Sequence, residues 1–154
     1  MIEVAAAAPS DLDAVRVLFR AYQAWLGLSL NFQDFEGELA ALPGKYVPPR
    51  GALLLARADG AIAGVVALRP LEKSICEMKR LYVAGAFQRL GIGRVLTSAV
   101  IEAARAAGYR AMRLDTLASR MPAAVALYRG LGFVEIPAYI HNPEPDALYL
   151  ELAL

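Results

Sequence analysis

The segment Leu81–Arg94 joins an apolar β-type run to a helix that begins on two glycines one residue apart, Gly91 and Gly93. Glycine lets a backbone approach a ligand closely and point several N–H groups in one direction. The start of a helix adds unpaired N–H donors and the positive end of the helix dipole. Arg89 and Arg94 add positive charge, so the types and spacing of these residues predict a phosphate-binding loop.

Two other phosphate loops and one purely structural explanation compete for this segment. A dinucleotide-binding loop requires Gly-x-Gly-x-x-Gly, but Leu96 stands where the third glycine would be. A triphosphate-binding loop requires Gly-Lys-Ser or Gly-Lys-Thr, and the sequence contains neither. A helix that begins on glycines for structural reasons alone remains open at this point, so the surrounding sequence must decide.

The surrounding sequence resembles the GNAT superfamily of N-acetyltransferases. The acetyl-CoA loop of that family has the pattern Gln/Arg-x-x-Gly-x-Gly/Ala, which Gln88–Gly93 matches at every defined position. Lys79–Val83 is similar to the family's fourth strand, and Ala126–Phe133 is similar to its Leu-Tyr-x-x-x-Gly-Phe block. The chain departs from the family at Met121, where an asparagine often begins the second block, and at Gly85, where proline is usual.

The resemblance implies an enzyme that uses acetyl-CoA as co-substrate and no metal. In such enzymes a primary amine of a small molecule or peptide attacks the thioester directly, within a ternary complex and without a covalent enzyme intermediate. The alternative from another class is a non-catalytic regulatory domain that binds acyl-CoA. The residues that match the cofactor-binding segments are Leu81, Tyr82, Val83, Gln88, Arg89, Leu90, Gly91, Ile92, Gly93 and Arg94.

Direct transfer needs a base for the amine proton, a donor for the oxyanion and an acid for the leaving thiolate. Glu77 precedes Gln88 by eleven residues, the spacing at which histone-acetyltransferase relatives place their base. Strand alternation would put Glu77 on the same face as Leu81 and Val83. Tyr128 matches the tyrosine that hydrogen-bonds the CoA sulfur in many relatives. An ion-paired strand acid and a core aromatic remain the structural alternatives for Glu77 and Tyr128.

The acceptor site is predicted from fewer signals. Tyr22 and Trp25, with Phe32 beyond them, fall in the N-terminal helices that line acceptor sites in the family. Asp115 ends a strand beside the expected cleft, where it would bind a cationic amine or cap the next turn. His141 lies in a loop bounded by proline, where it would assist proton transfer or simply be exposed.

The elements that must position these residues follow from hydrophobic periodicity and turn signals. Helices are expected from Ser10, as the N-cap, to Leu26, and over 31–42, Gly91–Ala107 and Pro122–Leu131. Strands are expected over Ala52–Arg57, Ala61–Leu68, Ser74–Val83, Ala111–Thr116, Phe133–Tyr139 and Ala147–Leu154. The link Ala58–Gly60 predicts a hairpin, and the Ala5–Ala8 run is expected simply to precede the first helix.

This order of helices, an antiparallel run, and then alternating strands and helices predicts the α+β class. The length of 154 residues favours one domain, over 1–154. The GNAT resemblance implies a mixed, mostly antiparallel central β-sheet flanked by helices on both faces. The apolar last strand, Leu148–Leu154, would offer a homodimer contact if it lay at a sheet edge.

Composition limits the classes of partner. The chain carries 16 Lys and Arg against 15 Asp and Glu, a net charge of +1, which argues against a nucleic-acid binder. The positive charge is nevertheless local, because residues 79–129 hold nine basic and only two acidic side chains. Such a region suits one small polyanion, coenzyme A.

Other features of the sequence exclude further kinds of site. One cysteine, Cys76, and one histidine exclude intramolecular disulfides and cysteine- or histidine-paired metal clusters. The apolar stretch Ala61–Leu68 is far shorter than the ~20 residues of a membrane helix. The first residues lack the positive charge of a secretory signal. A cytoplasmic location is therefore expected, with no membrane partner.

Overall fold

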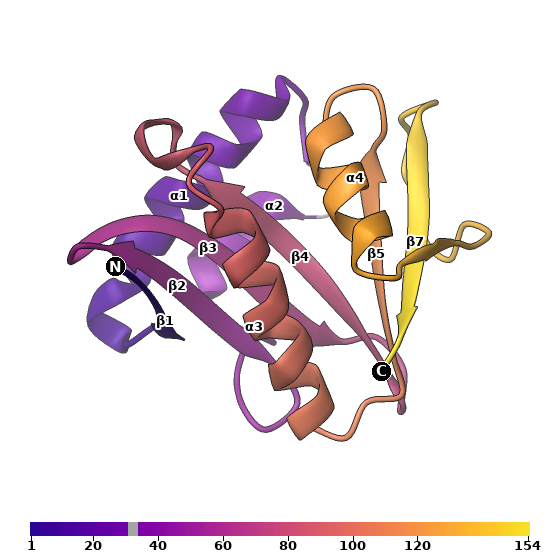
Figure 1. Ribbon diagram of the computed structural model, residues 1–154, viewed down its shortest axis with the longest axis horizontal. Helices are drawn as coiled ribbons and strands as arrows, with labels where there is room; N and C mark the ends of the chain where they lie inside the picture. The colour runs from indigo at the N-terminus through magenta and orange to yellow at the C-terminus, as the bar shows by residue number, and fades with distance from the viewer. Residues whose placement is uncertain (31–33) are drawn as a thin grey trace.

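A seven-stranded sheet carries helices on both of its faces in the computed structural model, which describes residues 1–30 and 34–154 (Figure 1). The strand order is β1-β2-β3-β4-β5-β7-β6, and every neighbouring pair is antiparallel except β4 and β5. The strands are β1 (Ile2–Ala6), β2 (Ala52–Ala58), β3 (Ala61–Pro70), β4 (Ile75–Val83), β5 (Ala111–Leu117), β6 (Val134–Glu135) and β7 (Ala147–Ala153). The predicted α+β fold with a mixed, mostly antiparallel sheet is confirmed.

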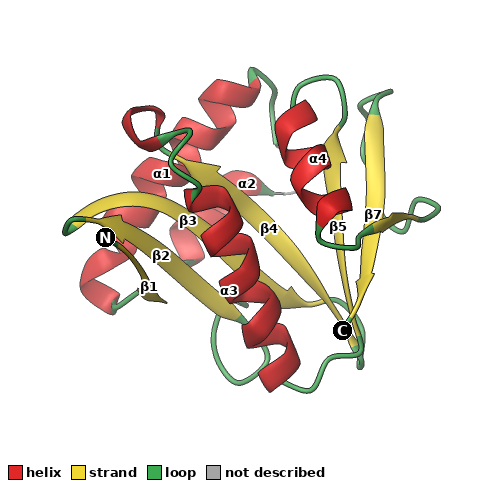
Figure 2. Ribbon diagram, viewed as in Figure 1, coloured by secondary structure: helices red, strands yellow, loops and turns green. Residues whose placement is uncertain are grey.

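Four α-helices in the described residues cover the sheet. They are α1 (Leu12–Leu26), α2 (Phe35–Ala41), α3 (Ile92–Ala106) and α4 (Pro122–Gly130). Figure 2 shows α3 and α4 in front of the sheet and α1 and α2 behind it. Each face therefore has its own apolar core, one around Leu96 under α3 and one around Phe19 and Phe35 under α1 and α2. No described helix has both the length and the apolar character needed to cross a membrane.

The hairpin between β2 and β3 forms as predicted. Asp59 and Gly60 both have positive φ angles, 49° and 86°, which is the backbone of the tight turn that Asp-Gly favours. The strand that follows is an unbroken apolar run because both of its faces are covered. The other predicted helices and strands, apart from those corrected below, agree with the structure to within a few residues at each end.

The N-terminus differs from the prediction in two respects. The run before the first helix contributes β1, which pairs with β2 from Ile2 opposite Ala58 onwards. Alanine has little strand preference of its own, so this strand depends on backbone pairing with its neighbour. Ser10 does not cap α1, because Pro9–Asp11 forms a separate 3₁₀ turn, η1, before it. Of the predicted second helix, residues 31–33, with Phe32, lie outside the described residues.

The C-terminal prediction is also corrected. Of the expected strand 133–139, only Val134 and Glu135 form register pairs with β7, and Ile136 adds one hydrogen bond to the Tyr149 carbonyl oxygen. Pro137 has no N–H with which to extend the ladder. The last strand, β7, lies between β5 and β6 and not at the edge of the sheet. The condition under which the last strand was expected to offer a dimer contact is therefore not met.

The parallel pair β4–β5 is short and opens into a wedge. Register pairs join Ile75 to Ala111, Cys76 to Met112 and Glu77 to Arg113, and none follows. Both strands continue beyond this point, and Figure 1 shows them diverging towards the top of the view. The backbone edges of β4 and β5 thus face each other without pairing where the wedge widens.

A β-bulge in β4 begins just inside this wedge. Lys79 lies opposite Ala67 and Tyr82 opposite Val65, so three steps along β4 match two along β3. Arg80, within the bulge, has a φ of 62°. The extra residue reverses the alternation of side chains. Glu77 faces the side of α1 and α2, whereas Leu81 and Val83 pack into the core under α3. The expectation that these three share a face is therefore wrong.

Candidate functional site

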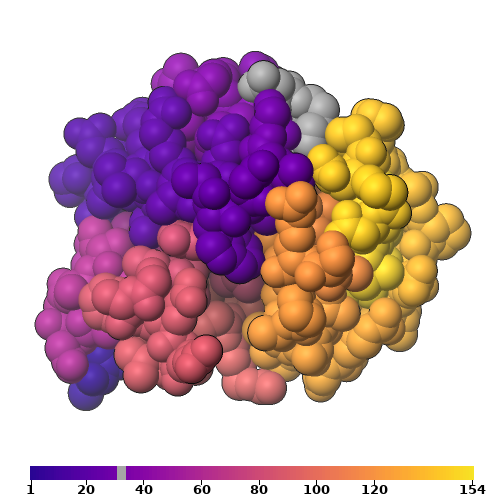
Figure 3. Space-filling view, turned by 90° about the horizontal axis from the view of Figure 1, so that it is seen from above, coloured from indigo at the N-terminus to yellow at the C-terminus, as the bar shows by residue number. Residues whose placement is uncertain are grey.

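A cavity of about 490 Å³ occupies the wedge between β4 and β5. Its walls come from β4, the loop and start of α3, β5, α4 and the end of α1. Figure 3 looks down on the molecule and shows a hollow bordered by the indigo N-terminal helix, the rose segment after β4 and orange α4. Segments far apart in the sequence therefore contribute to one site.

The glycine loop forms one end of this cavity. After the short helix η3 (Gly85–Phe87), Arg89 and Gly91 take left-handed conformations, with φ angles of 66° and 79°, and α3 begins. A Cβ placed on Gly91 or Gly93 would meet no atom of the described residues within 4 Å. The start of α3 is therefore uncrowded at both glycines, which allows the close approach that an anion site at a helix N-terminus requires.

Eight of the ten predicted cofactor-binding residues line the cavity, all except Leu90 and Arg94. Both exceptions are exposed, with 58% of Leu90 accessible to solvent. Gln88 contributes to the loop itself, since its Nε2 donates a hydrogen bond to the carbonyl oxygen of Val83 at 3.1 Å. The motif therefore both builds the loop and lines the cavity.

Tyr128 reaches the same cavity from α4. The residue is buried, and its ring packs against Phe133 with a centroid distance of 5.6 Å. Among the described residues, its hydroxyl has no hydrogen-bond partner. Every fully buried side-chain oxygen or nitrogen atom of the described residues does have a partner. The hydroxyl must therefore be accessible from the cavity that Tyr128 lines. Burial raises the pKa of Tyr128 above its ordinary value, so the phenol stays protonated.

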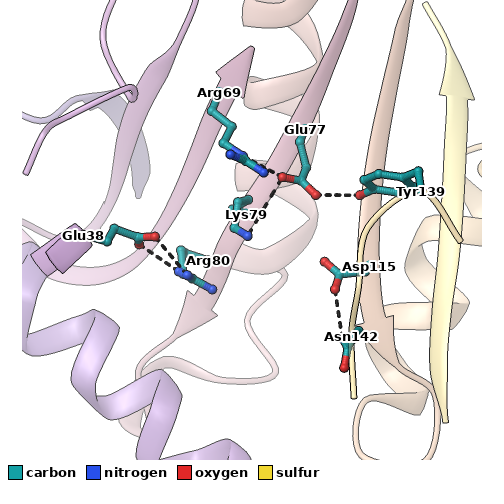
Figure 4. A network of polar contacts seen from close by, with 8 residues as sticks. All are labelled: Glu38, Arg69, Glu77, Lys79, Arg80, Asp115, Tyr139 and Asn142. Carbon is teal, nitrogen blue, oxygen red and sulfur yellow. Dashed lines mark hydrogen bonds and ion pairs between the residues drawn. The ribbon is translucent and has the colours of Figure 1, made fainter. Parts of the chain in front are cut away.

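Glu77 is fully buried within a network of polar groups. Its Oε1 accepts a hydrogen bond from Arg69 Nε at 2.7 Å and lies 3.9 Å from Lys79 Nζ, while Oε2 accepts from the Tyr139 hydroxyl at 2.6 Å (Figure 4). Glu77 is not part of the cavity wall, whereas Lys79 is. The ion-paired strand acid, left open by the sequence, is the arrangement present here.

Burial also affects the lysine beside this carboxylate. Desolvation, followed by the charge of Arg80, lowers the pKa of Lys79, and the opposing attraction of Glu77 is smaller. Lys79 therefore places an amine whose charged form is disfavoured by burial at the boundary between the buried network and the cavity.

The predicted acceptor residues separate into two places. Tyr22 and Trp25 line the cavity from α1 and pack against Tyr82, with ring centroids 6.1 and 6.4 Å away. Burial raises the pKa of Tyr22 to about 12. Asp115 lines the same cavity from β5. His141 is exposed and borders a second cavity, of about 730 Å³, which Lys79 also lines.

Asn142 was not predicted, and it positions Asp115. Its Nδ2 donates a hydrogen bond to Asp115 Oδ2 at 2.9 Å, and its Oδ1 accepts one from the Glu144 backbone at 3.0 Å. Asp115 is therefore held by the loop before β7 and does not cap a turn. The Asn-Pro pair in that loop marks a turn in the sequence, but nothing in it indicates the partner on β5.

Arg80 is a second residue whose role the sequence did not indicate. Its guanidinium makes two hydrogen bonds of 2.9 Å to the carboxylate of Glu38 in α2 (Figure 4). A non-glycine residue held in a left-handed conformation costs about 1–3 kcal/mol, so the pair sits at a point of backbone strain.

Cys76 is a buried strand residue, as expected. Burial raises the pKa of its thiol to about 12, and Sγ lies 3.5 Å from the Ala111 carbonyl oxygen. A thiol that remains protonated at neutral pH is a poor nucleophile. The geometry therefore gives Cys76 a packing role beside the β4–β5 pairs.

Comparisons with known proteins agree with this geometry. The model of the family described as the acetyltransferase (GNAT) family matches residues 13–133. The chain is 40% identical to an uncharacterized N-acetyltransferase of Schizosaccharomyces pombe over 148 residues, which is 95% of this chain and 90% of that protein.

Solved structures show the same fold. A GNAT-family acetyltransferase from Staphylococcus aureus superposes with a TM-score of 0.81 at 19% identity, over 99% of each chain. A Salmonella typhimurium structure, described as an acetyltransferase with its cofactor acetyl-CoA, gives a TM-score of 0.76 at 21% identity, over 99% of this chain and 94% of that one.

Proposed function

The chain belongs to the GNAT family of N-acetyltransferases, and on that premise we propose that it moves an acetyl group from acetyl-CoA to a primary amine of a small molecule or peptide. One observation carries the proposal. A single cavity runs from the open glycine start of α3, through the wedge between β4 and β5, to the aromatic end of α1. Such a cavity suits an elongated phosphate-bearing substrate at one end and an acceptor at the other.

Acetyl-CoA would be held mainly by backbone groups. The proposal assigns its pyrophosphate to the N–H groups at Gly91–Gly93 and to Arg89, and its pantetheine arm to the β4 backbone over Leu81–Val83. Two observations support this: the space beside both glycines is open, and β4 has no β5 partner beyond Glu77. N–H groups of the same stretch would stabilise the oxyanion of the tetrahedral intermediate.

The reaction then needs two proton transfers. The amine nitrogen attacks the thioester carbon, the carbon–sulfur bond breaks, and the Tyr128 hydroxyl gives a proton to the leaving thiolate and regains one from water. The amine is bound between Asp115 and the aromatic residues Tyr22 and Trp25. Because Glu77 is not part of the cavity wall, a water carries the amine proton away, either to Glu77 as the base or to solvent.

Thiol release from acetyl-CoA, measured across a panel of primary amines, tests this function. We expect at least one amine to accelerate release and to be recovered with an acetyl group. A thiol reagent suits the assay, because the buried Cys76 should add little background. Tight binding of CoA with no acceleration by any amine would instead support a non-catalytic acyl-CoA-binding domain.

Replacing Gly93 with alanine should separate ligand binding from folding. The added Cβ meets open space and favours the helix, so the free energy of unfolding should be unchanged or rise by up to about 1 kcal/mol. If phosphates lie beside Gly93, the affinity for acetyl-CoA should fall about tenfold, or about 1.4 kcal/mol. Isothermal titration calorimetry and thermal unfolding measure the two effects.

Gly130 provides the matched control for this variant. It ends α4, does not line the cavity, and likewise has no described atom within 4 Å of an added Cβ. Gly130→Ala should leave acetyl-CoA affinity unchanged. Equal affinity in the Gly93→Ala and Gly130→Ala variants would remove the glycine loop from the proposed cofactor site.

A further inference from the structure

Arg80 has the backbone of a residue that must be held in place. Its φ of 62° lies in the left-handed region, which residues with a Cβ avoid unless their surroundings impose it. Its side chain is only 3% exposed, although it carries a charge. Both the backbone and the guanidinium of Arg80 therefore depend on specific partners.

Helix α2 supplies those partners. Arg80 Nε donates to Glu38 Oε2 and Nη2 donates to Oε1, both at 2.9 Å, so the carboxylate grips the guanidinium with both oxygens. The guanidinium carbon also lies 5.3 Å from the ring centroid of Phe35, one turn earlier in the same helix. A two-point contact of this kind fixes orientation as well as distance. It links two segments 42 residues apart.

The contact acts at a particular place in β4. Arg80 follows Glu77, the last β4 residue paired with β5, by three positions and lines the cavity. The bulge that contains it sets the direction of the next peptide groups, Leu81–Val83. These are the groups to which the proposed function assigns the pantetheine arm and the oxyanion.

We propose that Glu38 is a positioning residue for acetyl transfer. Through its two hydrogen bonds to Arg80 it holds the β4 bulge, and with it the Leu81–Val83 backbone, in the geometry that the reaction requires. Glu38 itself touches neither the oxyanion nor the thioester. The inference rests on the proposed function, and it connects a helix on the acceptor side of the sheet to the strand that would hold the acetyl group.

A glycine at position 80 provides the decisive test, because glycine adopts a positive φ without strain. Glu38→Gln should lower kcat about tenfold, with little change in the KM for acetyl-CoA, since a small displacement of reacting groups is costly. In an Arg80→Gly background, where the bulge no longer needs the contact, Glu38→Gln should lower kcat no further. Arg80→Val, which combines a β-branched side chain with a left-handed backbone, should be at least about tenfold slower than Arg80→Gly.

Glu36 provides the matched control on the same helix. It accepts two hydrogen bonds from Arg20, at 3.1 and 3.2 Å, but this pair is exposed and neither residue lines the cavity. Glu36→Gln should leave kcat and both KM values unchanged. The thermal unfolding midpoint of every variant verifies folding. If Glu38→Gln does not fold, the comparison of kcat between Arg80→Gly and Arg80→Val tests whether the reaction depends on the left-handed backbone at position 80.

Three results would overturn the inference. The first is an unchanged kcat in a folded Glu38→Gln variant, and the second is an equal loss from Glu38→Gln in both backgrounds. The third is equal inactivity of Arg80→Gly and Arg80→Val, which would mean that the guanidinium itself contacts substrate. A wild-type chain that releases no thiol with any amine would instead overturn the proposed function, and this inference with it.

Discussion

Replacing Tyr128 with phenylalanine is expected to lower kcat about 100-fold while the affinity for acetyl-CoA changes little. The variant keeps the ring, and with it the packing against Phe133, but removes the hydroxyl that reaches the cavity. That hydroxyl has no hydrogen-bond partner among the described residues, so its removal leaves no other described group unsatisfied. Steady-state kinetics and a separate binding titration distinguish the two quantities.

The pH dependence should be consistent with this assignment. Burial raises the pKa of Tyr128 above the ordinary value of about 10, so its hydroxyl remains a proton donor through neutral and mildly alkaline pH. The rate of the wild-type enzyme should therefore show no loss from Tyr128 ionisation below about pH 10. Loss would begin only as the pH approaches the raised value, where the phenol becomes a phenolate.

Tyr109 provides the control for removing a hydroxyl. Its OH donates to the Arg50 carbonyl oxygen at 2.6 Å, and the residue is buried outside the cavity. Tyr109→Phe should cost about 1 kcal/mol of stability and leave kcat unchanged. Wild-type kcat in the Tyr128→Phe variant would exclude Tyr128 from the mechanism.

Replacing Glu77 with alanine is expected to cost about 3 kcal/mol of unfolding free energy. The variant would remove the buried carboxylate that ion-pairs with Arg69 and lies beside Lys79, and it would leave the Tyr139 hydroxyl without its acceptor. Glu77→Gln keeps the shape and one carbonyl acceptor, so it should lose less stability. Urea unfolding of the wild type, Glu77→Gln and Glu77→Ala measures the order of their unfolding free energies.

A second variant of the same residue tests the route by which the amine proton leaves. If Glu77 is the base, Glu77→Gln should change the pH profile of kcat/KM. An unchanged profile in a folded Glu77→Gln variant would exclude Glu77 as the base and assign the proton to water. Thermal unfolding of the same sample separates this outcome from a simple loss of structure.

The parts of the fold that the sequence predicts well are those determined by local chemistry. Asp59 and Gly60 specify a tight turn, and Gly91 and Gly93 specify a helix start that is open to a ligand. Hydrophobic periodicity predicted the helix that carries Tyr128, and the structure places this residue in the cavity wall. In each case the signal lies within a few neighbouring residues.

The parts that could not be predicted depend on contacts between distant segments. The residues next to Arg80 do not indicate a left-handed backbone conformation, because its partner Glu38 lies 42 positions earlier. Simple alternation, which takes no account of the bulge, places Glu77 and Leu81 on the same face of the sheet, whereas they lie on opposite faces. The pairing of β1 with β2 and the contact of Asn142 with Asp115 are likewise invisible to local patterns.

Several expectations concern matters outside the fold. The cytoplasmic location, the single domain over 1–154 and a homodimeric state all stay predictions, and the last has lost its proposed contact surface on β7. Solution measurements of mass would address the oligomeric state directly.

The short β4–β5 pairing has a consequence for how the protein unfolds. Three register pairs form the seam between the two parts of the sheet, β1 to β4 on one side and β5, β7 and β6 on the other. Local unfolding tends to follow such weak boundaries. A ligand seated in the wedge would bridge the seam and stabilise the native state by mass action. The bound ligand would then hold the two parts of the sheet together. The cooperativity of unfolding would therefore depend on whether the wedge is occupied.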